Sequence, residues 1–219
     1  MSTASHLLVL GTTNSGKLRE LAELLDPLGI PCRSLAGLPG SVEVAETGST
    51  FGENAALKAT TQAVALGQWV LAEDSGLVVD ALGGAPGIYS ARFSDPGATD
   101  ARNNALLLER LAAVPHLPRT AHYACHAALS DPAGTIVAVS SGTCGGLIAT
   151  ALQGAGGFGY DPLFIVPEYH RTFGELAPAV KSVISHRARA LRALIPAIRR
   201  LLGSAGAGSA PSPRPAAVR

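Results

Sequence analysis

The sequence predicts an α/β fold, or a related α+β fold, in which helices pack around a mixed β-sheet. Two observations support this prediction: strand-like and helical segments alternate in the first part of the chain, and a run of antiparallel strands follows. The 219 residues are 47% hydrophobic and 15% charged, so the chain can bury a sizeable core. We expect one domain over residues 1–202, while the order of its strands stays open.

Hydrophobic periodicity, glycines and capping residues place the elements along the chain. A polar loop at Gly11–Gly16 separates the first strand from the first helix, and Thr47–Thr50 offers caps for a second helix. The expected strands are His6–Leu10, Cys32–Leu35, Gln68–Ala72, Leu77–Leu82, Thr120–Leu129 and Thr135–Thr143. The first expected helix carries the apolar stripe Leu18–Leu28, and the second extends through about Leu66 and ends at Gly67. The third covers Asp100–Ala113, and the last covers Ser185–Leu202 with Ile195 facing inward.

Charge and cysteine content indicate a cytoplasmic protein without nucleic-acid or membrane partners. The formal net charge is +1, so any anion binding must come from locally placed lysines and arginines. No apolar run is long enough to span a membrane, and the N-terminus lacks the positive region of a signal peptide. Cys32, Cys125 and Cys144 are odd in number and widely spaced, which favours reduced thiols. Residues 203–219 are mainly Gly, Ala, Ser and Pro and are expected to be a disordered tail.

The most informative segment is VLAEDSGLVVD at Val70–Asp80, which places Glu73 and Asp74 between two apolar runs. Charges in an apolar setting pay a desolvation penalty, which a metal cation can offset, and oxygen ligands suit Mg²⁺. The alternative is a polar hairpin turn at Ser75-Gly76 with solvated acids. By itself, the segment leaves these two interpretations about equal.

A second motif, GTTNSGK at Gly11–Lys17, follows a strand and opens a helix. Backbone N–H groups at a helix start bind phosphate when small residues allow close approach, and Lys17 adds a positive charge. The spacing matches a P-loop, but Leu18 replaces the hydroxyl residue that holds Mg²⁺ in P-loop enzymes. The alternative is an ordinary capped helix start.

Three further segments carry candidate binding residues. Asn54 and Lys58 are four residues apart and share a helical face, with Glu46 just before that helix. This face could bind phosphate, and Glu46 could complete a metal site, although a solvated face would show the same pattern. The aromatics of GGFGYDP at Gly156–Pro162 could stack a base or belong to the core. Lys181 with Ser185-His186-Arg187 could hydrogen-bond a base or form a basic, solvated helix start.

Taken in order, five motifs resemble the inosine/xanthosine triphosphate pyrophosphatases, the house-cleaning enzymes for deaminated purine nucleotides. The motifs are TTNSGKLRELAELL, ETGSTFGENAALKA, LAEDSGLVVDALGGAPGIYSARF, GGFGYDPLF and KSVISHRARAL. The resemblance implies a Mg²⁺-dependent hydrolase that converts dITP, ITP or XTP to the monophosphate and pyrophosphate. It also implies an elongated α/β homodimer whose active site lies in a cleft between two lobes.

The resemblance also implies a role for each matching residue. Asp74 is the catalytic base and a metal ligand, Glu46 is a second metal ligand, and Ser75 contacts substrate. The phosphate contacts are Thr12, Thr13, Asn14, Ser15, Gly16, Lys17 and Lys58. The base pocket is formed by Phe158, Gly159, Tyr160 and Asp161, with Phe158 stacking, and the purine is recognised by Lys181, His186 and Arg187.

One departure from the family pattern concerns Glu73, because bacterial members often carry Asp-Asp before Ser-Gly. Glu73 keeps a carboxylate but places it one methylene farther from the backbone, so a metal role follows less directly for Glu73 than for Asp74. The rival predictions are a P-loop-like ATPase or kinase, a Maf-like nucleotide pyrophosphatase, and a nucleotide-binding regulator without catalysis.

Overall fold

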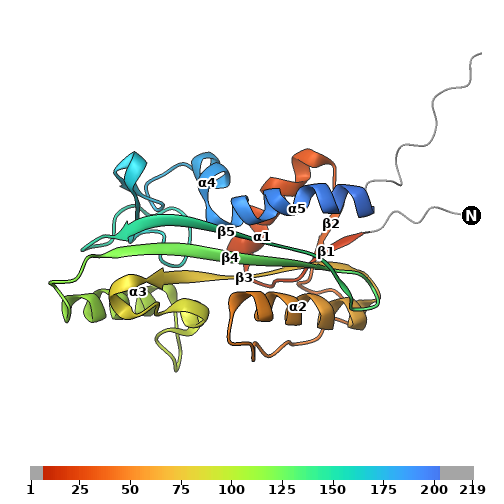
Figure 1. Ribbon diagram of the computed structural model, residues 1–219, viewed down its shortest axis with the longest axis horizontal. Coiled ribbons are helices and arrows are strands. Elements are labelled where there is room, and N and C mark those ends of the chain that lie inside the picture. Colours follow the sequence, from red (N-terminus) through yellow and green to blue (C-terminus); the bar gives the residue numbers. More distant parts are fainter. Residues whose placement is uncertain (1–6, 203–219) are drawn as a thin grey trace, which may run out of the picture.

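The structure is a computed structural model that describes residues 7–202 of the chain. Within these residues a mixed seven-stranded sheet has the order β2-β1-β3-β4-β5-β6-β7, and β3, β4 and β5 run along the long axis of the molecule (Figure 1). The strands are β1 (Leu8–Leu10), β2 (Cys32–Ser34), β3 (Trp69–Val79), β4 (Thr120–Ser130), β5 (Ile136–Ile148), β6 (Phe164–Val166) and β7 (Arg171–Thr172). The α/β prediction is confirmed. His6 and the expected tail at residues 203–219 lie outside the described residues.

The helices cover both faces of the sheet, with α2 and α3 on one side and α1, α4 and α5 on the other (Figure 1). They are α1 (Ser15–Leu25), α2 (Phe51–Leu66), α3 (Asp100–Ala112), α4 (Pro178–Ile184) and α5 (His186–Leu202). Short 3₁₀ segments are η1 (Asp26–Leu28), η2 (Asp80–Leu82), η3 (Gly87–Arg92) and η4 (Pro167–Tyr169). No helix in the described range 7–202 is both long and apolar enough to cross a membrane.

Local signals explain where α2 begins and ends. The Thr50 hydroxyl accepts the backbone N–H of Glu53, which satisfies one of the free donors of the first turn. Gly67 adopts a left-handed conformation with φ of 61°, which is readily available to glycine, and its N–H closes the helix on Ala63. Both predicted boundaries of this helix are therefore confirmed.

The predicted turn at Ser75-Gly76 is wrong, because β3 is a single continuous strand of 11 residues. It pairs with β4 along this stretch, and Ser75 lies opposite Cys125. Gly76 is needed for close packing instead, since a Cβ there would lie 2.4 Å from the carbonyl oxygen of Gly87. Pairing with a long neighbouring strand overrides the local preference of Ser-Gly for a turn.

Other differences are smaller. The structure also contains η3, α4, β6 and β7, which were not predicted from the sequence. In α5 the side chain of Leu194 is buried, whereas Ile195, which was expected to face inward, is only partly buried. Pro196 lies within the helix. Cys32, Cys125 and Cys144, which all fall within the described residues, are free thiols as predicted.

The core follows the alternation of side chains along β3. Val70 packs with α2, whereas Leu71 packs with α1 and α5. A third cluster fills the far end of the molecule and includes Leu77, Leu107 and Phe164. The elongated sheet therefore has cores at both ends, and the polar residues described next lie between them.

Candidate active site

The candidate site lies at the edge of β3, beyond the point where β1 stops pairing with it. β1 pairs with β3 only as far as Leu10 and Leu71, whereas β4 continues along the other edge. Two adjoining cavities there share Asn14, Lys17 and Glu46. We call them the polar cavity, against α2 and the start of α1, and the aromatic cavity, against the loop Gly156–Pro162, which we call the aromatic loop.

These cavities collect most residues that the sequence predicted to bind substrate or metal. Those in the polar cavity are Thr12, Thr13, Asn14, Lys17, Glu46 and Lys58. Those in the aromatic cavity are Asn14, Lys17, Glu46, Asp74, Ser75, Phe158, Gly159, Tyr160, Asp161, Lys181, His186 and Arg187. Ser15 and Gly16 instead line a third cavity, between α1 and the aromatic loop.

The start of α1 is a capped helix whose turn faces both cavities. The Asn14 side chain accepts the backbone N–H of Lys17 at 3.0 Å, and the Thr12 hydroxyl accepts the N–H of Asn14 at 3.2 Å. Gly16 permits a close approach, because a Cβ there would lie 2.6 Å from the Phe158 ring. Capping and anion binding are compatible here, since the cap uses only part of the turn's donors.

On one face of β3, Asp74 forms a cluster with α2. Its Oδ1 lies 3.0 Å from Lys58 Nζ, and its Oδ2 accepts a hydrogen bond from Asn54 Nδ2 at 3.3 Å. Lys58 also lies 2.5 Å from Glu46 Oε1, and Arg92 lies 3.3 Å from the other oxygen of Glu46. The predicted shared face of Asn54 and Lys58 is therefore directed at the acidic groups.

Burial decides the proton affinity of Asp74. It raises the pKa of this carboxyl above its usual value, and the ammonium of Lys58 offsets only part of the effect. Burial also acts to lower the pKa of Lys58, but the charges of Asp74 and Glu46 outweigh it, so that pKa is raised. Asp74 thus combines a place in the wall of the aromatic cavity with an increased tendency to take a proton.

On the opposite face of β3, Glu73 is enclosed by cations. Its Oε1 lies 3.1 Å from Arg187 Nε and 3.3 Å from Lys17 Nζ, while the Cys125 thiol lies 3.6 Å from Oε2. Burial would raise the pKa of Glu73, but Arg187 and Lys17 outweigh burial and hold it far below the usual range. Arg187 also forms an ion pair with Glu20.

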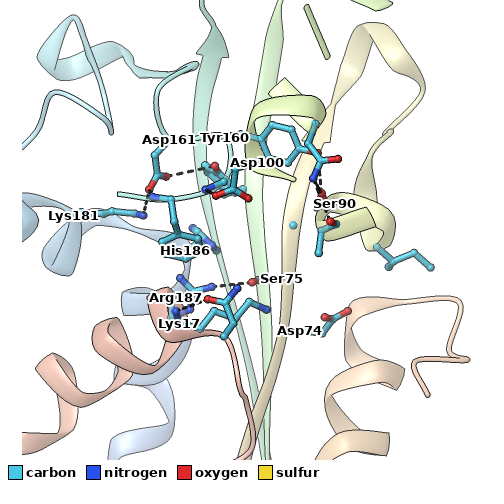
Figure 2. A pocket seen from close by; sticks show the side chains of 18 of the residues that line it. Lys17, Asp74, Ser75, Ser90, Asp100, Tyr160, Asp161, Lys181, His186 and Arg187 are labelled. Carbon is cyan, nitrogen blue, oxygen red and sulfur yellow. Dashed lines mark hydrogen bonds and ion pairs between the residues drawn. The ribbon is translucent and has the colours of Figure 1, made fainter. Parts of the chain in front are cut away.

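Two expectations about the acidic segment are therefore wrong. Glu73 and Asp74 are 2% and 5% exposed, so they are not the solvated acids of a turn. Because neighbouring strand residues project to opposite faces, they also do not form a paired site for one cation. Figure 2 shows Asp74 on the other side of the β3 ribbon from Arg187 and Lys17.

The aromatic loop presents Phe158 to a ring of charged groups. Lys181 Nζ lies 4.7 Å and Arg187 Cζ 5.7 Å from the centre of the Phe158 ring. Asp161 accepts the N–H of Phe158 at 2.9 Å and binds Lys181 at 2.5 Å. Burial raises the pKa of Asp161, and Lys181 opposes this shift. Tyr160 belongs to the core, as one alternative held, whereas Phe158 is half-buried and lines the aromatic cavity.

The basic motif near the start of α5 is buried, so the prediction of a solvated helix start is wrong. Lys181, His186 and Arg187 are all less than a tenth exposed. His186 stacks on Tyr123 at 4.6 Å, and its Nδ1 has no hydrogen-bond partner within residues 7–202. Burial, followed by the charge of Arg187, holds the pKa of His186 well below its usual value, so this ring is neutral.

The sequence and the fold were compared with those of known proteins. The sequence model of the Ham1 family matches residues 8–197, which is most of the chain. The chain belongs to the Ham1 family. The dITP/XTP pyrophosphatase of Rhodopirellula baltica is 53% identical over 197 residues, which cover 90% of this chain and 95% of the relative. That of Desulforamulus reducens is 50% identical over 194 residues, covering 89% and 96%.

Solved structures of Ham1 proteins share the fold of this family member. The HAM1 protein from Coxiella burnetii superimposes with a TM-score of 0.81 at 40% identity, covering 89% of this chain and 99% of that one. The Staphylococcus aureus Ham1 protein gives a TM-score of 0.77 at 37% identity, with 89% and 99% covered. The resemblance noted in the sequence is thereby confirmed at the level of the family.

Glu46 and Asp74 are the carboxylates that fit a divalent cation in this Ham1 family member. Both contact the Lys58 ammonium, so their oxygens converge on one positively charged position. No cluster of three or more acidic, histidine or cysteine ligands occurs within the described part of the chain. Two carboxylates that leave further positions to water and phosphate oxygens suit Mg²⁺ better than zinc or an all-protein calcium site.

Two amides of the aromatic loop are engaged within the protein. The N–H of Phe158 is bound to Asp161, and the N–H of Gly159 is bound to Asp100 at 2.7 Å. These two amides are therefore already engaged, whereas Lys181, His186 and Arg187 present polar side-chain atoms to the aromatic cavity.

Sequence reasoning missed several polar residues in the cavity walls or next to them. Glu20 lies one turn after Lys17 on α1, and this spacing was the available signal for it. Asn103 and Asn104 precede Leu107 on the inward face of α3, and both are buried. Buried amides in an apolar stripe indicate specific hydrogen-bond partners, which the sequence does not name.

Proposed function

We propose that this Ham1 family member hydrolyses dITP, ITP and XTP to the nucleoside monophosphate and pyrophosphate, with Mg²⁺ as cofactor. Relatives about 50% identical over most of the chain are named dITP/XTP pyrophosphatases. The observation that carries the proposal is the cluster of Asp74, Lys58 and Glu46 at the junction of the two cavities. One cavity offers amides and ammonium groups to a polyphosphate, and the other offers an aromatic face to a base.

The chain's own residues supply the acid-base and electrostatic parts of the reaction. Asp74 accepts the proton of the attacking water, and Asn54 holds that carboxylate in place through Oδ2. Lys17 and Lys58 stabilise negative charge on the leaving pyrophosphate. Glu46 and Asp74 would hold Mg²⁺, which when bound would neutralise charge at the phosphates.

Base choice follows from hydrogen-bond pairing in the aromatic cavity. The ring of Phe158 stacks the purine, and Lys181 and Arg187 donate to a 6-keto oxygen. The neutral ring of His186 adds a nitrogen, Nδ1, that is unpaired within the described residues and can bind the base edge. Adenine presents an amino group where these donors need an acceptor, and a buried donor left unpaired costs about 1–3 kcal/mol.

Two rival functions fit the residues of the site less well. A P-loop-like ATPase or kinase requires a hydroxyl side chain where this chain has Leu18. The Leu18 side chain, on α1, packs against the hydrophobic core instead. A regulator that only binds nucleotides would not need a buried carboxylate of raised pKa beside two ammonium groups.

One assay separates these possibilities. The protein is incubated with dITP, ITP, XTP, ATP or UTP in the presence of Mg²⁺, and the products are separated by anion-exchange chromatography. We expect inosine or xanthosine monophosphate and pyrophosphate, with slow turnover of ATP and UTP. Release of orthophosphate and a diphosphate, or no turnover, would overturn the proposal. Replacing Mg²⁺ with Ca²⁺, or removing it with a chelator, tests whether turnover requires Mg²⁺.

We also propose a cytoplasmic homodimer. The family resemblance and the reduced cysteines support this assignment. Light scattering coupled to size-exclusion chromatography should give twice the mass of one chain, and a monomer mass over the micromolar range would contradict it.

A further inference from the structure

Helix α3 holds the aromatic loop through both backbone groups of one residue. Asp100 Oδ2 accepts the N–H of Gly159 at 2.7 Å, and Asn104 Nδ2 donates to the carbonyl oxygen of Gly159 at 2.9 Å. Asp100 and Asn104 are one helical turn apart and so lie on the same face of α3. They are 59 and 55 residues from Gly159 in the sequence, so the contact is made by tertiary structure alone.

The same helix holds the opposite wall of the aromatic cavity. Asn103 donates to the carbonyl oxygens of Ser90 and Ala91 at 3.3 and 3.2 Å, and it accepts the N–H of Ser94 at 2.9 Å. The Tyr160 hydroxyl donates to Ser90 at 2.8 Å and so joins the two walls directly. Because α3 bonds both walls, its first turns determine the distance between η3 and the aromatic loop.

Gly159 depends on these bonds, because side-chain packing does not hold it. Its φ is +61°, and a Cβ added there would meet no described atom within 4 Å. The preceding residue, Phe158, has its own N–H bound to Asp161. The peptide groups on both sides of Phe158 are therefore fixed by carboxylates, one from the aromatic loop and one from α3, and this fixes the direction of the ring.

We infer that Asp100 and Asn104 are positioning residues that determine the base specificity of the site. By anchoring Gly159, they fix the direction of the Phe158 ring and so the aromatic face that is offered, next to Lys181, to a purine with a 6-keto group. This inference rests on the proposed function for the class of substrate. It assigns no contact with the substrate to Asp100 or Asn104.

The test compares Asp100→Ala, Asp100→Asn and Asn104→Ala with the unaltered protein. Glu109→Gln is the matched control, because it removes a carboxylate from an exposed position on the same helix. Asp100→Ala and Asn104→Ala should raise the KM for ITP about tenfold, change kcat less than threefold, and narrow the preference for ITP over ATP. The KM of Asp100→Asn for ITP should stay within about threefold of that of the unaltered protein, because its amide oxygen can still accept the N–H of Gly159.

Hydrogen exchange of the aromatic loop gives a second readout that does not depend on activity. Without nucleotide, Asp100→Ala should accelerate exchange of the Gly159 amide at least about tenfold, while Glu109→Gln should leave it unchanged. Unchanged exchange in Asp100→Ala would overturn the inference. Faster exchange with an unaltered KM and an unaltered ITP preference would also overturn it, since the bonds would then be structural only.

The proposed function can fail separately. If the unaltered protein hydrolyses none of the nucleotides, the proposed function is wrong, and calorimetric affinities for ITP and ATP replace KM in judging Asp100 and Asn104. A loss of ITP affinity in Asp100→Ala would then support the inference, and equal affinities would overturn it.

Discussion

Glu73 and Asp74 are neighbours in one strand, but the two faces of β3 give them opposite properties. On the face towards α1 and α5, Arg187 and Lys17 hold the pKa of Glu73 far below its usual value against the effect of burial. On the face towards α2, burial raises the pKa of Asp74 despite Lys58. The first carboxylate is locked as an anion, and the second can accept a proton.

The comparison shows how environment separates the roles of two similar groups. Glu73 itself lines neither cavity, and its partner Arg187 also binds Glu20 and Ser75. Asp74 lines the aromatic cavity and shares the Lys58 ammonium with Glu46. Carboxylates whose pKa values are pushed apart by their surroundings identify the acid-base group of a site. We therefore expect substitutions on the two faces to affect different measurements.

The largest expected effect is on catalysis, from Asp74→Asn. The amide cannot accept the proton of the attacking water, so turnover of dITP should fall about a thousandfold, while nucleotide affinity stays close to that of the unaltered protein. Pyrophosphate release and calorimetry measure the two quantities. Asp80→Asn, at an exposed position after β3, is the control. If Asp74→Asn retains more than a tenth of the activity, Asp74 is not the base.

The next effect is on stability, from Glu73→Gln. Removing one partner of a buried ion pair leaves Arg187 and Lys17 short of an acceptor, so the free energy of unfolding should fall by about 3 kcal/mol. Urea denaturation measures it, with exposed Glu109→Gln as the control. Asp74→Asn should cost less than about 1 kcal/mol in the same experiment. Equal losses for the two substitutions would remove the distinction between the faces.

A pH dependence should come from His186, a buried ring beside the aromatic cavity. Burial, Arg187 and Lys181 lower its pKa in the folded state and Glu73 opposes them, whereas the unfolded chain regains the usual value of 6.5. As the pH falls below about 6.5, only the unfolded state takes up this proton, so stability is lost by about 1.4 kcal/mol per pH unit. Above that pH the contribution of the neutral ring is fully present.

The measurement is denaturation between pH 5 and 8, compared with His186→Phe, which retains an aromatic ring against Tyr123. His186→Phe should remove most of this acid-dependent loss, while the exposed-site control His116→Gln should retain it. An identical pH profile in His186→Phe would show that another group causes the loss.

The smallest effect concerns Ser75, whose hydroxyl accepts a hydrogen bond from Arg187 at 2.9 Å. Ser75→Ala should lower the free energy of unfolding by about 1 kcal/mol. Ser140→Ala, which removes a hydroxyl bond to α5 away from both cavities, is the control for stability. A rise in KM for Ser75→Ala alone would show that Ser75 also contacts substrate, whereas unchanged stability would show that its bond to Arg187 does not stabilise the fold.

Local patterns in the sequence correctly predicted much of the fold. The cap at Thr50 and the stop at Gly67 bound α2 as expected, because both act within a single turn of the helix. The spacing of Asn54 and Lys58 placed them on one face, and both reach Asp74. The motif order identified the Ham1 family.

Long-range contacts account for what the sequence did not reveal. Ser75-Gly76 lies within a strand because β4 pairs with it, and this pairing brings together residues about fifty positions apart. Lys181 and Arg187 are buried because Glu20, Asp161 and Glu73 converge on them from other elements.

The amino acids alone determine where helices start and stop and which motifs this protein carries, because these depend on neighbours within a few residues. Only the assembled sheet decides that Glu73 and Asp74 point away from each other and that α3 holds Gly159. The reason is physical: the pKa of a carboxyl and the position of a loop depend on burial and on charges brought close by folding.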